Sequence, residues 1–193
     1  MGDPLPLFLR PMHLKKKFGQ HFLKDPEQAK RLADGIIDWG VNYEHLVEIG
    51  PGGGVLTRFL AREVKGEKSL TLIEIDRDLW PKLTEDFVTE KVQLVEQDFL
   101  KWDIKSMTND FGVAGNFPYN ISSQIVFKIL ENKERIPEMV GMFQKEVAQR
   151  IASGNGTKVY GILSVLVQAY YDVDILYTLG PEAFNPPPKV DSM

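Results

Sequence analysis

Two stretches of the sequence combine residue types that suit binding of a nucleoside-containing ligand. Gly50-Pro51-Gly52-Gly53-Gly54 follows a short apolar run. Glycine permits positive φ angles and lets a ligand approach the backbone closely, although this stretch can also be only a tight turn. Glu74 follows the next apolar run, where a carboxylate can accept hydrogen bonds from a ribose diol or remain solvated. Asp76 is an alternative for this role, and we favour Glu74 because it directly follows the apolar run.

Asp98 and the tetrapeptide Asn116-Phe117-Pro118-Tyr119 follow two further apolar runs. Asp98 can accept from an adenine amino group while a neighbouring backbone N–H reaches a ring nitrogen, or it can cap a turn. The tetrapeptide suits methylation of adenine N6, a poor nucleophile because its lone pair is delocalised into the ring. The Asn116 side-chain oxygen and the Pro118 carbonyl can hold the two amino hydrogens, and Tyr119 can stack on the base. An ordinary Asn/Pro turn is the alternative.

The elements expected to position these residues alternate between strands and helices. We expect strands at 46–49, 70–75, 92–96, 111–115, 139–143 and 173–179, and helices at 26–39, 55–64, 77–87, 121–130 and 160–169. Asp25 is expected to cap the first helix, and Gly40 to follow its end. This alternation predicts an α/β fold with a doubly wound, mostly parallel sheet. Ligands bind such sheets at the carboxyl ends of the strands, where the polar stretches fall.

Composition limits the class of protein. The chain has 193 residues, of which 43% are hydrophobic and 26% charged, as in a globular domain. It has no apolar run of the roughly 18–20 residues that a membrane helix needs. Cysteine is absent, which excludes disulfides and thiolate metal sites and fits a reducing cytosol. The net charge of -4 argues against a basic surface over the whole chain, but the cluster Lys15–Lys17 can bind phosphates or be simply solvated.

The motifs together resemble those of the small-subunit ribosomal RNA adenine dimethyltransferase family. They occur in the family's order from about Lys17 to Ser192, which is far more specific than any one of them. The last three are more similar to the ribosome-assembly branch than to the antibiotic-resistance branch. The matching stretches are 18–23 (FGQHFL), 48–52 with 56–57, 73–76, 97–98, 116–119, 143–147 (FQKEV), 160–164 (YGILS) and 184–192 (FNPPPKVDS).

The resemblance implies a Rossmann-like class I fold that binds S-adenosylmethionine and needs no metal. It also implies N6-dimethylation of two adjacent adenosines near the 3′ end of small-subunit ribosomal RNA, in the cytoplasm, by a protein without a membrane segment that is monomeric when complete. Two positions depart from the family, because asparagine is usual at 21 and leucine at 117. The cofactor would contact His21, Leu23, Gly50, Glu74, Asp98 and Asn116, and the base would contact Asn116, Pro118, Tyr119 and Phe184.

Two of these residues have simpler interpretations when they are read without the family. His21 by itself suits a half-buried surface histidine better than a catalyst. Phe184, which the family would use to clamp the base from another side, can equally be a core aromatic.

We expect a leader or disordered basic segment at 1–16 and the binding domain at 17–193. The resemblance places a last strand after Ser192, antiparallel between the fifth and sixth strands, followed by a helical domain that contacts RNA. We expect both to be missing. The strand at 171–179 would then be poorly supported, displaced or paired with another molecule, because open sheet edges invite pairing. Cofactor binding would survive, whereas RNA methylation would be weak.

Three alternatives remain open. A nicotinamide-dependent dehydrogenase shares the glycine turn and Glu74 but leaves the tetrapeptide at 116–119 unexplained. A non-catalytic RNA-binding assembly factor predicts damaged cofactor residues, which the sequence does not show. The third alternative is a closely related enzyme that acts on large-subunit RNA or on DNA.

Overall fold

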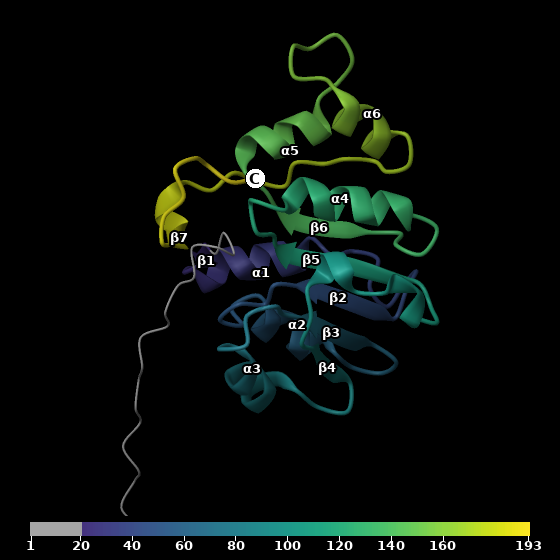
Figure 1. Cartoon of the computed structure of the whole chain (residues 1–193), viewed down its shortest axis with the longest axis vertical. Coiled ribbons are helices and arrows are strands. Elements are labelled where there is room, and N and C mark those ends of the chain that lie inside the picture. Colours follow the sequence, from purple (N-terminus) through teal and green to yellow (C-terminus); the bar gives the residue numbers. More distant parts are fainter. Residues whose placement is uncertain (1–20) are drawn as a thin grey trace, which may run out of the picture.

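A five-stranded parallel sheet forms the centre of residues 21–193, the part of the chain that the computed structural model describes (Figure 1). In spatial order its strands are β4 (Val92–Val95), β3 (Ser69–Ile73), β2 (His45–Ile49), β5 (Phe111–Asn116) and β6 (Met139–Met142). A separate antiparallel pair joins β1 (Phe22–Leu23) to β7 (Phe184–Asn185). The predicted doubly wound parallel sheet is confirmed. The expected leader and the motif residues 18–20 lie outside the described residues.

Helices cover both faces of the sheet. One core cluster joins α1 (Pro26–Asp34), α2 (Thr57–Glu63) and the end of α3 (Trp80–Phe87) to one face. The other joins α4 (Ser122–Glu131), α5 (Lys145–Ala152) and α6 (Ile162–Gln168) to the opposite face, as the grouping in Figure 1 shows. Burial on both faces explains why β2, β3 and β5 are buried along almost their whole length. Three short 3-10 helices complete the elements: η2 (Phe99–Lys101), η3 (Ile104–Ser106) and η4 (Pro181–Ala183).

The first helix is shorter than predicted. Asp25 caps α1 as expected, because its Oδ1 accepts from the Glu27 N–H at 2.9 Å. The helix ends at Asp34 rather than at residue 39, and Gly35 is its C-cap. The Glu138 carboxylate accepts from the backbone N–H groups of residues 37 and 38 at 3.0 and 3.3 Å. These tertiary hydrogen bonds replace the helical ones, so the chain turns away before Gly40.

The strand predicted at 173–179 does not form. Residues 171–178 have no strand pairing in the described structure, and only Leu179 forms a bridge, with Ser192. Ser192 and Leu179 exchange backbone hydrogen bonds of 2.9 and 2.8 Å, while Met193 and Phe143 exchange bonds of 2.9 and 2.7 Å. Residues 191–193 therefore lie antiparallel between the end of β6 and Leu179. The expectation that 171–179 would be poorly supported is confirmed, but the start of the strand that we expected to be missing is present.

The helix α5 was not among the predicted elements. It begins immediately after Gln144, carries Glu146 in its first turn and Arg150 in its last, and buries Ala148 and Ile151. This charge arrangement favours a helix through its dipole. The remaining predicted helices and strands agree with the structure to within about three residues at each end.

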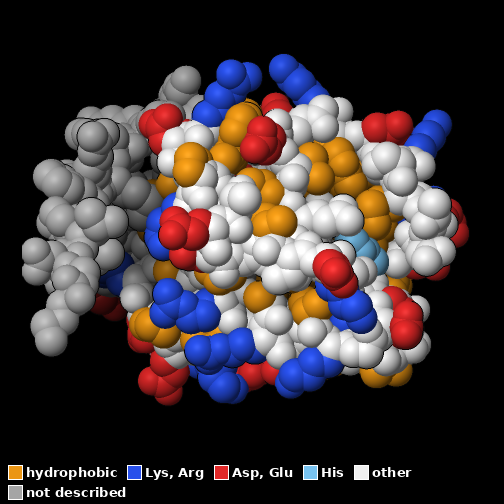
Figure 2. Space-filling view, turned by 90° about the horizontal axis from the view of Figure 1, so that it is seen from below, with side chains coloured by type: hydrophobic (Ala, Val, Ile, Leu, Met, Phe, Trp, Pro, Cys, Tyr) orange, Lys and Arg blue, Asp and Glu red, His pale blue; other side chains and the backbone are white. Residues whose placement is uncertain are grey.

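The surface seen from below the view of Figure 1 carries both signs of charge. In Figure 2 the lysine and arginine side chains are interspersed with aspartate and glutamate, so this face presents no continuous basic region. Among residues 21–193, no helix has the length and apolar character needed to cross a membrane.

Candidate functional site

The carboxyl ends of β2, β3 and β5 open onto a cavity of about 250 Å³. Segments far apart in the sequence meet there, as the doubly wound sheet predicts. Seven of the nine residues predicted for the site line this cavity, and Leu23 and Phe184 do not. The seven are His21, Gly50, Glu74, Asp98, Asn116, Pro118 and Tyr119.

The glycine turn after β2 is held by the carboxylate of Glu74. Gly50 and Gly52 have φ angles of 66° and 57°, which other residues rarely adopt. Glu74 Oε2 accepts from the Gly52 N–H at 3.1 Å, and its Oε1 accepts from the Asp76 N–H at 2.8 Å. Burial raises the pKa of Glu74, and these N–H groups oppose that shift. Each carboxylate oxygen keeps a second lone pair, so Glu74 can hold the turn and still accept from a ligand.

The structure distinguishes the two acids that compete for the ribose role. Glu74 lines the cavity, whereas Asp76 is not among its lining residues. Asp76 is buried and its Oδ1 accepts from the Asp78 N–H at 3.2 Å. The geometry therefore supports the choice of Glu74.

Asp98 combines the two roles that its sequence position allows. Its Oδ1 accepts from the Leu100 N–H at 2.9 Å, so it caps η2. The side chain also lines the cavity. Within the described part of the chain, the adjacent Phe99 N–H has no hydrogen-bond partner. A carboxylate beside an unused N–H is the pair that an adenine amino group and its neighbouring ring nitrogen require.

Asn116 ends β5 with its amide group held in a defined orientation. Its Nδ2 donates to the backbone carbonyl of His21 at 2.8 Å. The Oδ1 has no partner among residues 21–193 and is available as an acceptor. The Pro118 carbonyl already accepts from the Ile121 N–H at 3.1 Å, but a carbonyl oxygen can accept a second hydrogen bond.

The ring of Tyr119 is covered on one face by His21. The two rings are stacked with centroids 5.1 Å apart. His21 Nδ1 lies 2.8 Å from the Pro186 carbonyl and must donate to it, since a carbonyl only accepts. The Tyr119 hydroxyl pairs with the Ser192 hydroxyl, and burial raises the pKa of Tyr119. In this structure the imidazole occupies one face of the Tyr119 ring.

Leu23 and Phe184 lie in a core cluster outside the cavity. The two residues are opposite each other in the β1–β7 pair. They pack with Ala29, Met142 and Leu179, and Phe184 is 0% exposed. The structure therefore places Phe184 as a core aromatic, the simpler of the two interpretations. It gives no direct support to a contact of either residue with a bound ligand, since tertiary packing turns both side chains inward.

The apolar walls of the cavity were not predicted from the sequence. Phe22, Ile75 and Leu100 line it, and a side chain at Gly52 would meet the Phe22 ring 2.5 Å away. Phe22 lies within the first motif, and this position could have been noted there. Among the described residues, no group of three or more His, Cys, Asp or Glu side chains could hold a metal ion.

Comparison with known proteins agrees with this geometry. The family model described as ribosomal RNA adenine dimethylase matches residues 12–193. The chain belongs to this family. The resemblance seen in the ordered motifs is thereby confirmed.

Relatives within the family are similar over most of the chain. The ribosomal RNA small subunit methyltransferase A of Parabacteroides distasonis is 49% identical over 92% of this chain and 65% of that protein. The protein of the same name from Cytophaga hutchinsonii is 47% identical over 92% of this chain and 68% of that protein. This chain thus spans about two thirds of the length of these curated relatives.

A solved structure of a family relative shares the fold. The dimethyladenosine transferase of Plasmodium falciparum superposes with a TM-score of 0.72 and 30% sequence identity, over 89% of this chain and 61% of that one. The predicted Rossmann-like methyltransferase fold is confirmed.

Proposed function

We propose that this chain binds S-adenosylmethionine and is the catalytic unit of a small-subunit ribosomal RNA adenine-N6 dimethyltransferase. One observation carries the proposal: a single cavity brings together the glycine turn, Glu74, Asp98 and Asn116 from four separate segments. A dehydrogenase would use the first two features and leave the amide and the proline loop without a role.

The cavity residues fit the parts of this cofactor. Glu74 would accept from the ribose hydroxyls, and Asp98 with the Phe99 N–H would recognise the adenine. The glycine turn lets the backbone approach the ligand, since its positive φ angles expose peptide groups that a side chain would otherwise cover. His21, which belongs to the motif at 18–23, would also contact the cofactor. Bound S-adenosylmethionine supplies a methyl group already activated on a positively charged sulfur.

The chain's own contribution would be to position the attacking amine. Asn116 Oδ1 and the Pro118 carbonyl would accept the two N6 hydrogens, which favours a more tetrahedral nitrogen with its lone pair directed at the methyl group. The Tyr119 ring would support the base after the stacked His21 imidazole moves aside. Positioning of this kind can supply much of a rate enhancement. The nitrogen loses a proton after it has been methylated, so no strong base is required.

The proposed substrate is a pair of adjacent adenosines near the 3′ end of small-subunit ribosomal RNA. The family membership and the name shared by the curated relatives support this choice. The target bases must be unstacked to enter a cavity of this size. We further propose that the protein acts as a monomer in the cytoplasm, on the small ribosomal subunit, without a metal, and that the domain spans residues 17–193.

Two measurements test the proposal. Calorimetry should show that the wild-type chain binds S-adenosylmethionine. Labelled methyl transfer to unmethylated small subunits, with enzyme in excess, should yield dimethyladenosine. Asn116→Ala should lose transfer, whereas Asn109→Ala, an exposed amide at the other end of β5, should not. Absence of cofactor binding by the wild type, or undiminished transfer by Asn116→Ala, would overturn the proposal.

A further inference from the structure

Two cationic side chains bind the connection between β4 and β5. We call Lys128 with its acceptors the lysine clamp, and Arg135 with its acceptors the arginine clamp. This connection, residues 96–110, lies outside the sheet and contains η2 and η3. Lys128 on α4 donates to the carbonyls of Phe99, Leu100 and Trp102 at 2.7, 3.0 and 2.5 Å. Arg135, beyond the end of α4, binds the other end of the same connection.

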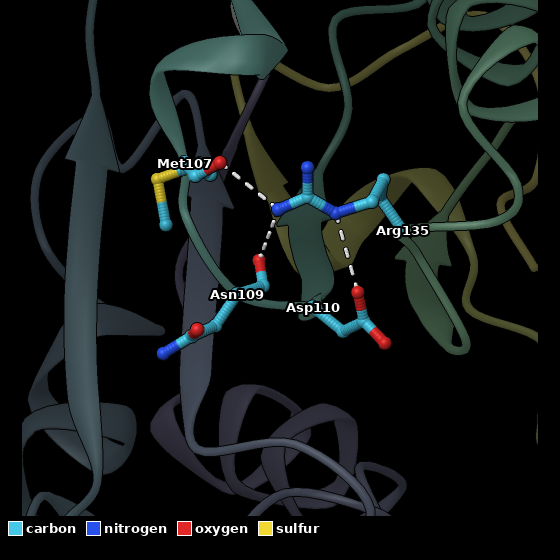
Figure 3. Close-up of polar contacts among 4 residues, drawn as sticks. All are labelled: Met107, Asn109, Asp110 and Arg135. Carbon is cyan, nitrogen blue, oxygen red and sulfur yellow. Dashed lines mark hydrogen bonds and ion pairs between the residues drawn. The ribbon is translucent and has the colours of Figure 1, made fainter.

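Figure 3 shows the arginine clamp. Its Nη2 donates to the carbonyls of Met107 and Asn109 at 2.9 and 2.8 Å, and its Nε donates to Asp110 at 3.2 Å. These acceptors lie just before β5 begins, at the amino end of that strand. None of them lines the cavity. Arg135 therefore fixes the fold of the connection at a distance from the site.

The lysine clamp acts at the cavity itself. Phe99 and Leu100, whose carbonyls Lys128 binds, line the cavity together with Asp98. The Lys128 ammonium also lies 5.1 Å from the centre of the Phe99 ring. Asp98 is thus the N-cap of η2, while the ammonium binds carbonyls within η2 and at its C-cap Trp102.

Partial burial lowers the pKa of Lys128, and the nearby carboxylates of Asp98, Asp103 and Glu131 limit this shift. Three carbonyl acceptors satisfy the three N–H bonds of an ammonium group. α4 begins three residues after Tyr119, so Lys128 connects the helix that follows the Asn116–Tyr119 loop to η2, and both the loop and η2 contribute residues to the cavity.

We propose that Lys128 is a positioning residue that fixes Asp98 and the Phe99 N–H for recognition of the cofactor's adenine. This inference rests on the proposed function and deepens it, because it assigns part of the nucleobase selectivity to a residue outside the ligand's reach. Without the ammonium, the Leu100 and Trp102 carbonyls lose this donor and the Phe99 carbonyl keeps only the Trp102 N–H, so the turn that presents Asp98 relaxes.

The test compares Lys128→Met with Arg135→Met, which removes a cation that also makes three hydrogen bonds to the same connection. Calorimetry would give the dissociation constants of S-adenosylhomocysteine and of S-inosylhomocysteine, which has a 6-oxo group instead of the amino group. The wild type should prefer the adenine compound. Lys128→Met should bind it about tenfold more weakly and lose most of that preference. Arg135→Met should lower the melting temperature and keep the preference.

The ratio of the two dissociation constants distinguishes a loss of positioning from a loss of stability. Partial unfolding weakens the binding of both ligands by the same factor and leaves the ratio unchanged. If Lys128→Met melts below the assay temperature, Lys128→Gln, which keeps a neutral donor group, replaces it and should show an intermediate ratio. An unchanged ratio in the folded lysine variant, or the same loss of ratio in both clamp variants, overturns the inference. If the wild type binds neither compound, the proposed function itself fails.

Discussion

The side-chain Nδ2 of Asn116 donates a 2.8 Å hydrogen bond to the backbone carbonyl of His21, a residue 95 positions earlier. This bond joins the end of β5 to the N-terminal motif and orients the amide so that its oxygen remains available. Because His21 contributes a backbone atom, the contact does not depend on the side chain at position 21. It does depend on a donor at position 116.

Asn116→Asp should therefore impair methyl transfer even though the shape of the side chain is kept. A carboxylate retains an acceptor for the amine but places a second oxygen against the His21 carbonyl. We expect transfer to fall by about 100-fold near neutral pH, as when one preorganised polar contact is lost from other active sites. Labelled transfer to small subunits measures the effect. Asn109→Asp is the matched control, and equal activity of the two variants would contradict the expectation.

Phe117 fills a space that two glycines provide. A Cβ atom at Gly115 would lie 2.9 Å from the Phe117 ring, and a Cβ at Gly141 would collide with it. Phe143 meets the same ring edge-on, with centroids 5.1 Å apart. We expect Gly141→Ala to destabilise the fold by about 1–3 kcal/mol through overpacking. The double variant Gly141→Ala with Phe117→Leu should regain part of the lost free energy of unfolding, as measured by denaturant unfolding. If the effects of the two substitutions simply add, the packing explanation is refuted.

Substitutions of Phe184 distinguish a role in core packing from a role in binding the base. Since its side chain is 0% exposed, Phe184→Ala should lower the free energy of unfolding by about 3–5 kcal/mol. Phe184→Leu keeps most of the volume and should retain most of the methyl transfer. The opposite pattern, normal stability with lost transfer in Phe184→Leu, would show that the aromatic ring contacts the base.

Glu48 makes the stability of the protein depend on pH. The side chain is 1% exposed, and its Oε2 has no hydrogen-bond partner among the described residues. Burial, with the nearby charge of Glu74, raises the pKa of Glu48 to about 8. Folding therefore favours the protonated form, and its contribution is complete below about pH 4.5 and lost as the pH rises to 8.

Glu48→Gln should flatten the pH dependence of stability in this window and stabilise the protein at pH 8 by a few kcal/mol. Denaturant melts between pH 5 and pH 9 measure the difference. Glu85→Gln, which removes an exposed carboxylate from α3, should leave the profile unchanged. Parallel profiles for wild type and Glu48→Gln would show that Glu48 is not the titrating group.

His45 should produce the opposite slope at lower pH. Its two ring nitrogens lie 2.7 and 2.9 Å from the Ser69 and Thr71 hydroxyls, and burial lowers its pKa to about 4. A depressed histidine pKa favours folding above about pH 6.5, and this contribution fades as the pH falls to 4. We expect about 2 kcal/mol to be lost over that range. His45→Gln should remove the slope in acid melts, and an unaltered acid profile would contradict the assignment.

The sequence alone predicted the parallel sheet and the position of the cavity, because both follow from local patterns. Short apolar strands alternating with helices require right-handed crossovers, which bring the carboxyl ends of the strands to one edge. Glu74, Asp98 and Asn116 each follow an apolar run, so their meeting at that edge did not depend on detailed packing. The Asp25 cap was predictable for the same local reason.

Only the tertiary structure decided the features that depend on contacts between distant segments. The Glu138 carboxylate ends α1 early, and residues 171–178 form no strand because no strand among the described residues pairs with them. The pairing of β1 with β7 turns Phe184 into the core, and the bond to Pro186 places His21 over Tyr119. Lys128 carried no motif, because its role arises from carbonyls more than 25 residues away that only the folded chain brings to its ammonium group.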